Sequence, residues 1–239
     1  MVVKSELKLI KSLQQKKYRN AHGLFVMEGK KAIEEVVQSG FEVYSLFSNR
    51  PEDLTFPGVQ TQKITSTELK HISSLKNPNG YLGVFHIPTP KQVKPLGWIL
   101  ALDGVQDPGN LGTIIRLCDW FGIDNLVCSL DTVDCFNPKV LQATMGSITR
   151  VNIVYENLSS FLSELALPIF GAFMDGANVT RGILPTAGVL VMGNEGKGIS
   201  DEIERLCTDK VSIQQFGEKS TESLNVAMAT SILLHEIRR

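Results

Sequence analysis

The stretch Gly188–Ser200, GVLVMGNEGKGIS, decides the fold of this chain. Its apolar part, Val189–Met192, is typical of a strand buried on both faces of a parallel sheet. The run ends in a glycine-rich turn that contains Glu195. Ligands of open α/β sheets bind outside the carboxyl ends of the strands, where glycines let the backbone approach them closely. The stretch therefore predicts an α/β fold with a polar ligand contact at Glu195; a plain strand-to-helix turn with a solvated Glu195 and Lys197 is the alternative interpretation.

The composition is that of an ordinary globular protein. The 239 residues are 43% hydrophobic and 21% charged, enough chain for one large or two small domains. No apolar run approaches the ~18 residues of a membrane span, and the N-terminal residues lack the pattern of a secretory signal. The four cysteines and four histidines do not have the spacing of metal ligands. We therefore expect a cytoplasmic protein without a membrane segment and without a metal.

Charge is distributed unevenly along the chain. Residues 1–95 hold 14 Lys and Arg against 8 Asp and Glu, whereas residues 96–239 hold 10 against 17. A basic N-terminal part is typical of a surface that binds a polyanion, although a solvated helical face is the more common meaning of a lysine-rich run. Three cations surround Tyr18, which suits RNA phosphates and a stacked base. The candidate RNA contacts are Lys16, Lys17, Arg19 and Lys30.

The order of short strands and helices predicts two α/β domains. A sequence of capping-box type, Thr65–Glu68, predicts the start of a helix in the first part. The segment Pro88–Pro95 has three prolines in eight residues, which can continue neither a helix nor a central strand. We expect an RNA-binding domain at residues 1–90, a linker at 91–96 and a catalytic domain at 97–239.

Two predicted helices of the second domain carry polar residues at their starts. Asn110 is predicted as the N-cap of a helix over Leu111–Phe121, and Arg116 stands clear of the apolar stripe of that helix. The final helix, which follows Asn225, is apolar almost all round. Such a helix is buried either in its own domain or in a subunit interface, and the second possibility predicts a homodimer.

Three segments now stand together: Asn110-x-Gly112-x-x-x-Arg116, Gly193-Asn194-Glu195-Gly196 and Ser223-Leu224-Asn225-Val226. Their order, spacing and flanking sequence resemble the SpoU/TrmH family of RNA ribose 2′-O-methyltransferases in the SPOUT superfamily. The resemblance to the catalytic domain covers about residues 97–238. Residues 17–36 resemble, more loosely, the L30e-like RNA substrate-binding domain of the family. The loop at 214–222 is longer than in many members.

The resemblance implies a parallel sheet with a trefoil knot that forms an S-adenosylmethionine site. It implies methyl transfer to the ribose 2′-hydroxyl of a nucleotide in ribosomal or transfer RNA. The catalytic residues would be Arg116, Asn110, Glu195, Ser223 and Asn225. The cofactor would be held by backbone groups of Gly193, Ile213 and Leu224, with Met192 and Asn194 beside them.

The chemistry constrains the role of Arg116. A ribose 2′-hydroxyl is a weak acid and needs help to lose its proton at neutral pH. A guanidinium is effectively always protonated, which makes a literal general base implausible. Our hypothesis is that Arg116 binds the adjacent phosphate and lowers the pKa of the hydroxyl, while the phosphate or a water accepts the proton. An ion pair with Glu195 would set the plane of the guanidinium.

Other functions fit the sequence less well. A Rossmann-type methyltransferase or dehydrogenase needs a GxGxxG-like turn after the first strand of the second domain, and Asp103–Gly109 lacks it. A P-loop nucleotidase needs Ser or Thr where Gly198 stands. A non-catalytic RNA-binding or RNA-remodelling protein on a methyltransferase-like fold is the remaining alternative. Loss of the cofactor residues would favour it, but these residues are present.

Overall fold

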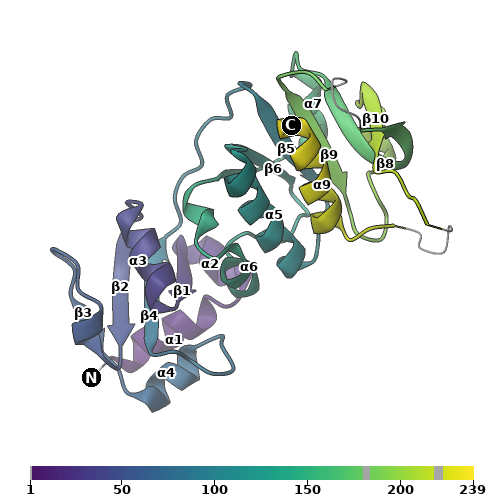
Figure 1. The fold of residues 1–239 in the computed structure, drawn as a ribbon. Coiled ribbons are helices and arrows are strands. Elements are labelled where there is room, and N and C mark those ends of the chain that lie inside the picture. Colours follow the sequence, from purple (N-terminus) through teal and green to yellow (C-terminus); the bar gives the residue numbers. More distant parts are fainter. Residues whose placement is uncertain (1, 180–183, 218–222) are drawn as a thin grey trace. The chain divides into compact units, whose positions relative to one another are not determined.

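The computed structural model of the chain describes residues 2–179, 184–217 and 223–239 (Figure 1). Part of the 214–222 loop, residues 218–222, lies outside the described residues. The chain forms two compact units. The first contains Met1–Thr89 and Phe136–Thr149, and the second contains Pro90–Cys135 and Arg150–Arg239. The segment 136–149, which the sequence analysis placed in the catalytic domain, thus packs with the first unit.

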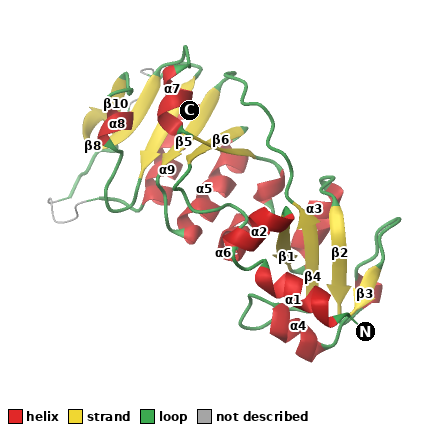
Figure 2. Ribbon diagram, turned by 180° about the vertical axis from the view of Figure 1, so that it is seen from behind, coloured by secondary structure: helices red, strands yellow, loops and turns green. Residues whose placement is uncertain are grey.

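The first unit is a four-stranded sheet with helices on both faces (Figure 2). Its strand order is β1-β4-β2-β3, in which β4 is antiparallel to β1 and β2, and β2 is parallel to β3. The elements are α1 (Lys4–Ser12), α2 (Lys16–His22), β1 (Leu24–Glu28), α3 (Lys30–Gln38), β2 (Val43–Ser48), η1 (Pro51–Asp53), β3 (Thr61–Lys63), α4 (Ser66–Ile72), β4 (Tyr81–His86), α6 (Pro138–Thr144) and η2 (Ser147–Thr149).

Helices α1 and α4 pack over one face of this sheet. Ile10 of α1 and Ile72 of α4 share a buried cluster with Leu82 of β4. The predicted capping box is present: the Thr65 side chain accepts from the backbone N–H of Glu68, and the Glu68 carboxylate accepts from the backbone N–H of Thr65 at 2.9 Å. Those bonds lower the pKa of Glu68. The capping residues therefore set the point at which α4 begins.

The segment 136–149 completes the core of the first unit. The ring of Phe136 lies 4.7 Å, centroid to centroid, from the ring of Phe25 in β1, which stacks in turn on Phe85 of β4. Gly146, which has a φ of 95°, lies against the carboxylate of Glu35 with no room for a Cβ atom. Both contacts depend on residues far from the N-terminal part of the chain. The first unit therefore has a discontinuous sequence.

The second unit contains a six-stranded sheet in which every neighbouring pair of strands is parallel. The strand order is β10-β8-β9-β5-β6-β7. The elements are β5 (Trp98–Asp103), α5 (Pro108–Phe121), β6 (Asn125–Ser129), β7 (Asn152–Glu156), α7 (Leu158–Ser163), β8 (Ile169–Asn178), β9 (Gly188–Gly193), α8 (Asp201–Glu204), β10 (Asp209–Ser212) and α9 (Val226–Arg238).

This arrangement confirms the expected parallel α/β sheet. The apolar run that decides the fold is β9, and Val189, Leu190, Val191 and Met192 are all buried. The trefoil knot that the family resemblance implies stays a prediction. No described helix is long and apolar enough to cross a membrane. Among the described residues, no group of three or more His, Cys, Asp or Glu side chains is placed to hold a metal ion.

The strand order of the second unit reverses at one point. From β5 the chain moves to β6 and β7 on one side, and then returns to build β8, β9 and β10 on the other. The order of the strands therefore reverses between β5 and β9, which lie next to each other in the sheet. Ligands of open α/β sheets bind at the carboxyl ends of the strands at such a switch point. Asp103 and Gly193, the last residues of the two strands, are register partners there.

Candidate active site

The loop after β9 begins with a close backbone contact. A Cβ atom on Gly193 would lie 2.2 Å from the carbonyl carbon of Gly198 and 2.3 Å from the backbone nitrogen of Ile199. Real Cβ atoms do not approach backbone atoms so closely, so only glycine allows this turn. The backbones of Asn194 and Gly198 exchange two hydrogen bonds of 2.9 Å across it. The turn is therefore tight and closed by its own backbone.

Asn194 ties this turn to the loop after β5. Its Oδ1 accepts hydrogen bonds from the backbone N–H groups of Gly196 and Lys197, and its Nδ2 donates to the carbonyl of Gly104 at 2.6 Å. The side chain predicted beside the cofactor thus joins the ends of β9 and β5. Its polar atoms all have partners in the protein, which makes Asn194 a positioning residue.

Helix α5 begins three residues earlier than the sequence analysis predicted. Asp107 is its N-cap: its Oδ1 accepts from the backbone N–H of Asn110 at 2.8 Å, and Pro108 is the first helical residue. The prediction that Asn110 caps this helix is wrong, because Asp107 followed by proline makes the better start. The side chain of Asn110 does not cap the helix and takes part in other contacts.

Glu195 receives hydrogen bonds from three donors on the α5 side of the site. Its Oε1 accepts from the backbone N–H of Asp107 and from Asn110 Nδ2, both at 3.0 Å, and its Oε2 accepts from the backbone N–H of Gln106 at 3.1 Å. Burial raises the pKa of Glu195, but these hydrogen bonds outweigh it and hold the pKa below its ordinary value of 4.5. The carboxylate is thus ionised at neutral pH and holds the loop in place.

Asn225 brings in the third segment. Its Oδ1 accepts from the backbone N–H groups of Ala227 and Met228 and so caps α9, while its Nδ2 donates to Asn110 Oδ1 at 2.9 Å. A carboxylate only accepts hydrogen bonds and a backbone N–H only donates, so the orientations of both amides are determined. Glu195, Asn110 and Asn225 form one continuous chain of hydrogen bonds, which joins residues up to 115 positions apart.

Arg116 stands apart from this chain of hydrogen bonds. It lies on α5, six residues or about 9 Å along the helix axis beyond Asn110. Its side chain is exposed and forms no ion pair with Glu195; across the described parts of the chain it has no hydrogen-bond partner. The predicted Arg116–Glu195 ion pair is therefore wrong for a single chain, because the loop donors occupy the carboxylate.

The remaining candidates of the second unit lie close to Asn225 in sequence or at strand ends. Ser223 and Leu224 directly precede it and are exposed, and residue Leu224 is 49% accessible. Ile213 follows β10 and is half-buried, whereas Met192 is buried inside the sheet. An exposed leucine beside a polar network offers an apolar surface that a ligand can cover.

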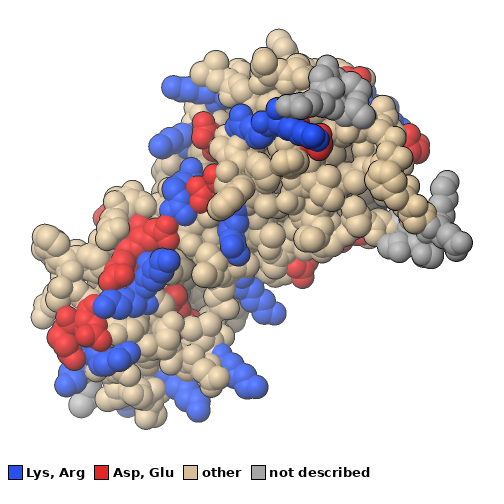
Figure 3. Space-filling view, viewed as in Figure 1, with Lys and Arg blue, Asp and Glu red and all other residues tan. Residues whose placement is uncertain are grey.

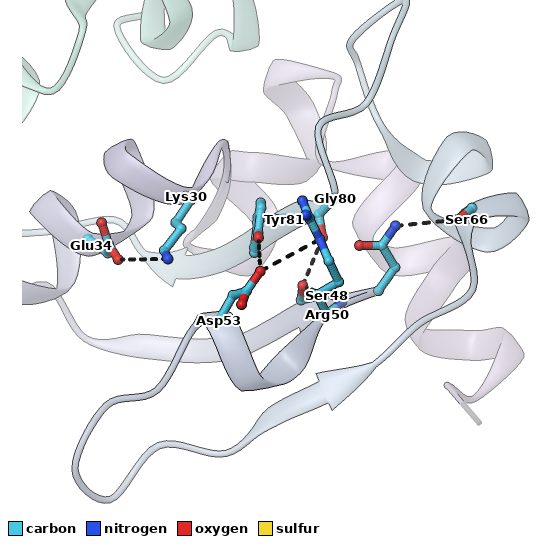
Figure 4. A network of polar contacts seen from close by, with 9 residues as sticks. Lys30, Glu34, Ser48, Arg50, Asp53, Ser66, Gly80 and Tyr81 are labelled. Atoms are coloured by element: carbon cyan, nitrogen blue, oxygen red, sulfur yellow. Dashed lines mark hydrogen bonds and ion pairs between the residues drawn. The ribbon is translucent and has the colours of Figure 1, made fainter.

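The predicted RNA contacts differ in exposure and in the groups they contact. Lys16 and Lys17 are exposed on α2, and the Nζ of Lys17 lies 4.6 Å from the centre of the Tyr18 ring. Lys30 is the first residue of α3, where it faces Glu34 at 4.0 Å (Figure 4). Arg19 is only 2% exposed, and its Nη1 donates to the carbonyls of Leu13 and Gln14. The prediction of a surface contact at Arg19 is therefore wrong, because this guanidinium binds backbone carbonyls just beyond the end of α1.

Sequence reasoning missed two residues that build the site. Gln106 and Asp107 contribute backbone N–H groups to Glu195, and the Gln106 side chain donates to the carbonyl of Asp131. Their contribution does not depend on side-chain type, so no motif could identify it. The Asp107-Pro108 pair was a readable signal for the true start of α5.

Comparison with known proteins agrees with this geometry. The model of the SpoU rRNA methylase family matches residues 97–235, and that of the MRM3-like substrate binding domain matches residues 4–83. The chain is 31% identical to the 23S rRNA (guanosine(2553)-2′-O)-methyltransferase RlmP of Bacillus subtilis, over 95% of this chain and 94% of that protein.

Solved structures give the same result. A putative RNA methyltransferase of the TrmH family from Porphyromonas gingivalis superposes with a TM-score of 0.91 at 36% identity, and covers 100% of this chain and 98% of its own. An AdoMet-bound rRNA methyltransferase from Sinorhizobium meliloti superposes with a TM-score of 0.88 at 29% identity, with 100% and 95% covered. The chain therefore belongs to the SpoU rRNA methylase family, which confirms the expectation of an RNA ribose 2′-O-methyltransferase that uses S-adenosylmethionine.

Proposed function

We propose that this protein methylates the 2′-hydroxyl of a nucleotide in large-subunit ribosomal RNA at the site built by Glu195, Asn110 and Asn225. The observation that carries the proposal is the hydrogen-bond chain through these three residues. It joins three distant segments at the switch point of the parallel sheet. The name of the B. subtilis relative supports 23S rRNA as the substrate class. Such a substrate also favours the cytoplasmic location that the sequence predicts.

The residues around the switch point fit S-adenosylmethionine. Gly193 is the last residue of β9, at the carboxyl edge of the sheet where ligands of such sheets bind. Leu224 and Ile213 present apolar surface that an adenosyl group can cover. When bound, the cofactor supplies a methyl group on a good leaving group. The protein has two remaining tasks, to align the ribose oxygen and to assist the loss of its proton.

We assign the second task to Arg116 through an RNA phosphate. The guanidinium stays protonated at all relevant pH values and cannot act as a base. Bound to the phosphate next to the target ribose, it stabilises the developing negative charge on the 2′-oxygen, and the phosphate or a water accepts the proton. Asn110 and Asn225 hold the ribose side of the site in place, and Glu195 fixes the loop before α5 and the side chain of Asn110.

We further propose that a second copy of the chain completes the site. The exposed face of α5 carries Arg116 and, one turn later, Trp120, which is 84% accessible. Helix α9 packs beside α5 (Figure 1) and exposes Met228 and Ile232, one turn apart. Large apolar side chains exposed together mark an interface. A homodimer across α5 and α9 would cover them and bring Arg116 to the site of the partner.

Substitution of Arg116 tests the assignment. We expect Arg116→Ala to lower transfer of labelled methyl from S-adenosylmethionine to 23S rRNA by about 10²–10⁴-fold, with cofactor binding in calorimetry unchanged. Arg205→Ala removes an exposed arginine outside the site and serves as the control. Unchanged turnover in Arg116→Ala would refute the role. Wild-type protein that binds RNA but not the cofactor would point instead to the non-catalytic RNA-binding alternative.

Mixing two variants with impaired activity tests the shared site. If Arg116 acts in the partner's site, a mixture of Arg116→Ala and Glu195→Gln chains contains heterodimers with one intact site, and activity returns. If each chain is self-sufficient, the mixture stays as inactive as its components. Trp120→Glu should convert the dimer to a monomer in light scattering after size-exclusion chromatography.

A further inference from the structure

The outer surface of the first unit carries a group of lysines that belongs to none of the predicted contacts. On α1, Lys4, Lys8 and Lys11 recur at intervals of four and three residues. At 100° per residue they fall within about 60° of one another on the helix surface. Glu6, the acidic residue of α1, lies on nearly the opposite side and is half-buried. The helix therefore presents an uninterrupted positive edge.

Helix α4 lies beside this edge and extends it. The Nζ of Lys11 donates to the carbonyl of His71 at 2.6 Å, and Gln14 Nε2 donates to the carbonyls of Ile72 and Ser73. These bonds connect the two helices on the side of α1 that carries the lysines. Lys70 of α4 and Lys76, just beyond it, are exposed and add two more charges. We call Lys4, Lys8, Lys11, Lys70 and Lys76 the lysine ridge.

The lysine ridge lacks counter-charges. Within the described parts of the chain, none of its five members forms an ion pair with a carboxylate. Glu68 of α4 is bound to Thr65 in the capping box and is not aimed at the lysines. Figure 3 shows blue side chains along the lower border of the first unit, where Figure 1 places α1 and α4.

Two other cations of this unit, by contrast, have local partners. Lys30 faces Glu34, and Arg50 lies 3.6 Å from Asp53 and over the Tyr81 ring (Figure 4). Their charge is compensated locally, and Arg19 is buried. A folded domain gains no stability from five like charges on two adjoining helices and the loop after the second, because they repel one another. A polyanionic partner explains their arrangement.

We propose that the lysine ridge binds phosphates of the ribosomal RNA substrate and supplies most of the sequence-independent affinity of the enzyme. The proposal rests on the proposed function, since it names the surface that holds the same RNA. Each lysine that neutralises a phosphate releases counterions. The logarithm of the binding constant therefore falls by about 0.7–0.9 per contact for each tenfold rise in salt concentration. Three lost contacts would lower the affinity by about 100-fold at physiological salt.

The test compares two triple variants with the same change in charge. Lys4→Gln, Lys8→Gln and Lys11→Gln together remove the α1 part of the ridge. Lys31→Gln, Lys63→Gln and Lys139→Gln remove three exposed lysines elsewhere in the same unit. Filter binding to a 23S rRNA transcript is measured between about 50 and 200 mM salt. For the ridge variant we expect the slope of log binding constant against log salt concentration to be smaller by about two, and the affinity to be about 100-fold lower. For the control variant we expect both values to stay near those of the wild type.

Further variants and control measurements keep the outcomes distinct. Because Lys11 also bonds to His71, the double variant Lys4→Gln, Lys8→Gln and the pair Lys70→Gln, Lys76→Gln are tested alongside, with melting temperatures. Cofactor binding should be unchanged in all of them. Equal losses in ridge and control variants, or no loss in either, would overturn the proposal. Wild-type protein that binds the transcript through the ridge but never methylates it would contradict the proposed function and leave the ridge intact.

Discussion

Replacing Glu195 by glutamine changes one carboxylate oxygen to an NH₂ group at nearly constant size. The three donors that face the carboxylate make the consequence predictable. If the remaining oxygen stays with Asp107 and Asn110, the new Nε2 faces the N–H of Gln106, and two donors oppose each other. The opposite orientation of the glutamine amide is less favourable, because its NH₂ group would then face two donors, the N–H of Asp107 and Nδ2 of Asn110. At least one charge-assisted hydrogen bond is lost in either case.

Loss of such a bond costs about 1.5–3 kcal/mol. Since 1.4 kcal/mol corresponds to a factor of ten, the ordered form of the site becomes about 10- to 150-fold less favoured. We expect methyl transfer to fall by a factor in that range, with the melting temperature lowered by roughly a few degrees. The assay is transfer of labelled methyl to 23S rRNA at saturating cofactor. Glu202→Gln, an exposed glutamate of α8, is the matched control.

Acid dependence gives a second readout of the same residue. The pKa of Glu195 is lowered in the folded protein, so its ionised form contributes stability above the ordinary value of 4.5. That contribution is lost as the pH falls through the lower, folded pKa. Glu195→Gln should abolish this part of the acid destabilisation. Equal activity and equal acid profiles of Glu195→Gln and Glu202→Gln would refute the positioning role.

Substitutions at Asn225, Gly193 and Arg19 separate structural from functional contributions. Asn225→Asp keeps the oxygen that caps α9 but removes the donor to Asn110, so methyl transfer should fall about tenfold. Asn225→Ala removes the cap as well and should also lose about 1 kcal/mol of stability, measured by urea unfolding. Gly193→Ala should destabilise the protein by about 1–3 kcal/mol in the same assay, because its Cβ would collide with Gly198, while Gly196→Ala should be tolerated. Arg19→Met should lower stability by about 2–4 kcal/mol by leaving two carbonyls without their donor, and RNA affinity of the folded protein should not change.

The sequence predicted those features that depend on local pattern. The apolar run of β9, the capping box of α4 and the three motifs that meet at the switch point could all be identified from residue types and spacing. Asn110 and Arg116 show the limit of this reasoning. The start of α5 was decided by competition between two possible caps three residues apart, and Asp107 with its following proline is the better one.

Contacts made by backbone atoms or across long separations could not be predicted. We expected the Glu195 carboxylate to form an ion pair with Arg116. Instead it accepts hydrogen bonds from two backbone N–H groups and from a side-chain amide. Arg19 was read as a surface cation because its neighbours are lysines. It is instead buried, and its guanidinium donates to the carbonyls of Leu13 and Gln14, which no single-residue preference encodes.

The discontinuous first unit affects how the protein can be divided. A truncated chain ending near Thr89 would leave the buried Phe25 ring without Phe136 and would lack the rest of the segment 136–149. Chimeras that exchange RNA specificity between relatives must therefore transplant two pieces of chain, the N-terminal one and the insert between β6 and β7. Because the polypeptide passes between the units at three points, a single protease cut at the proline-rich link would not separate them.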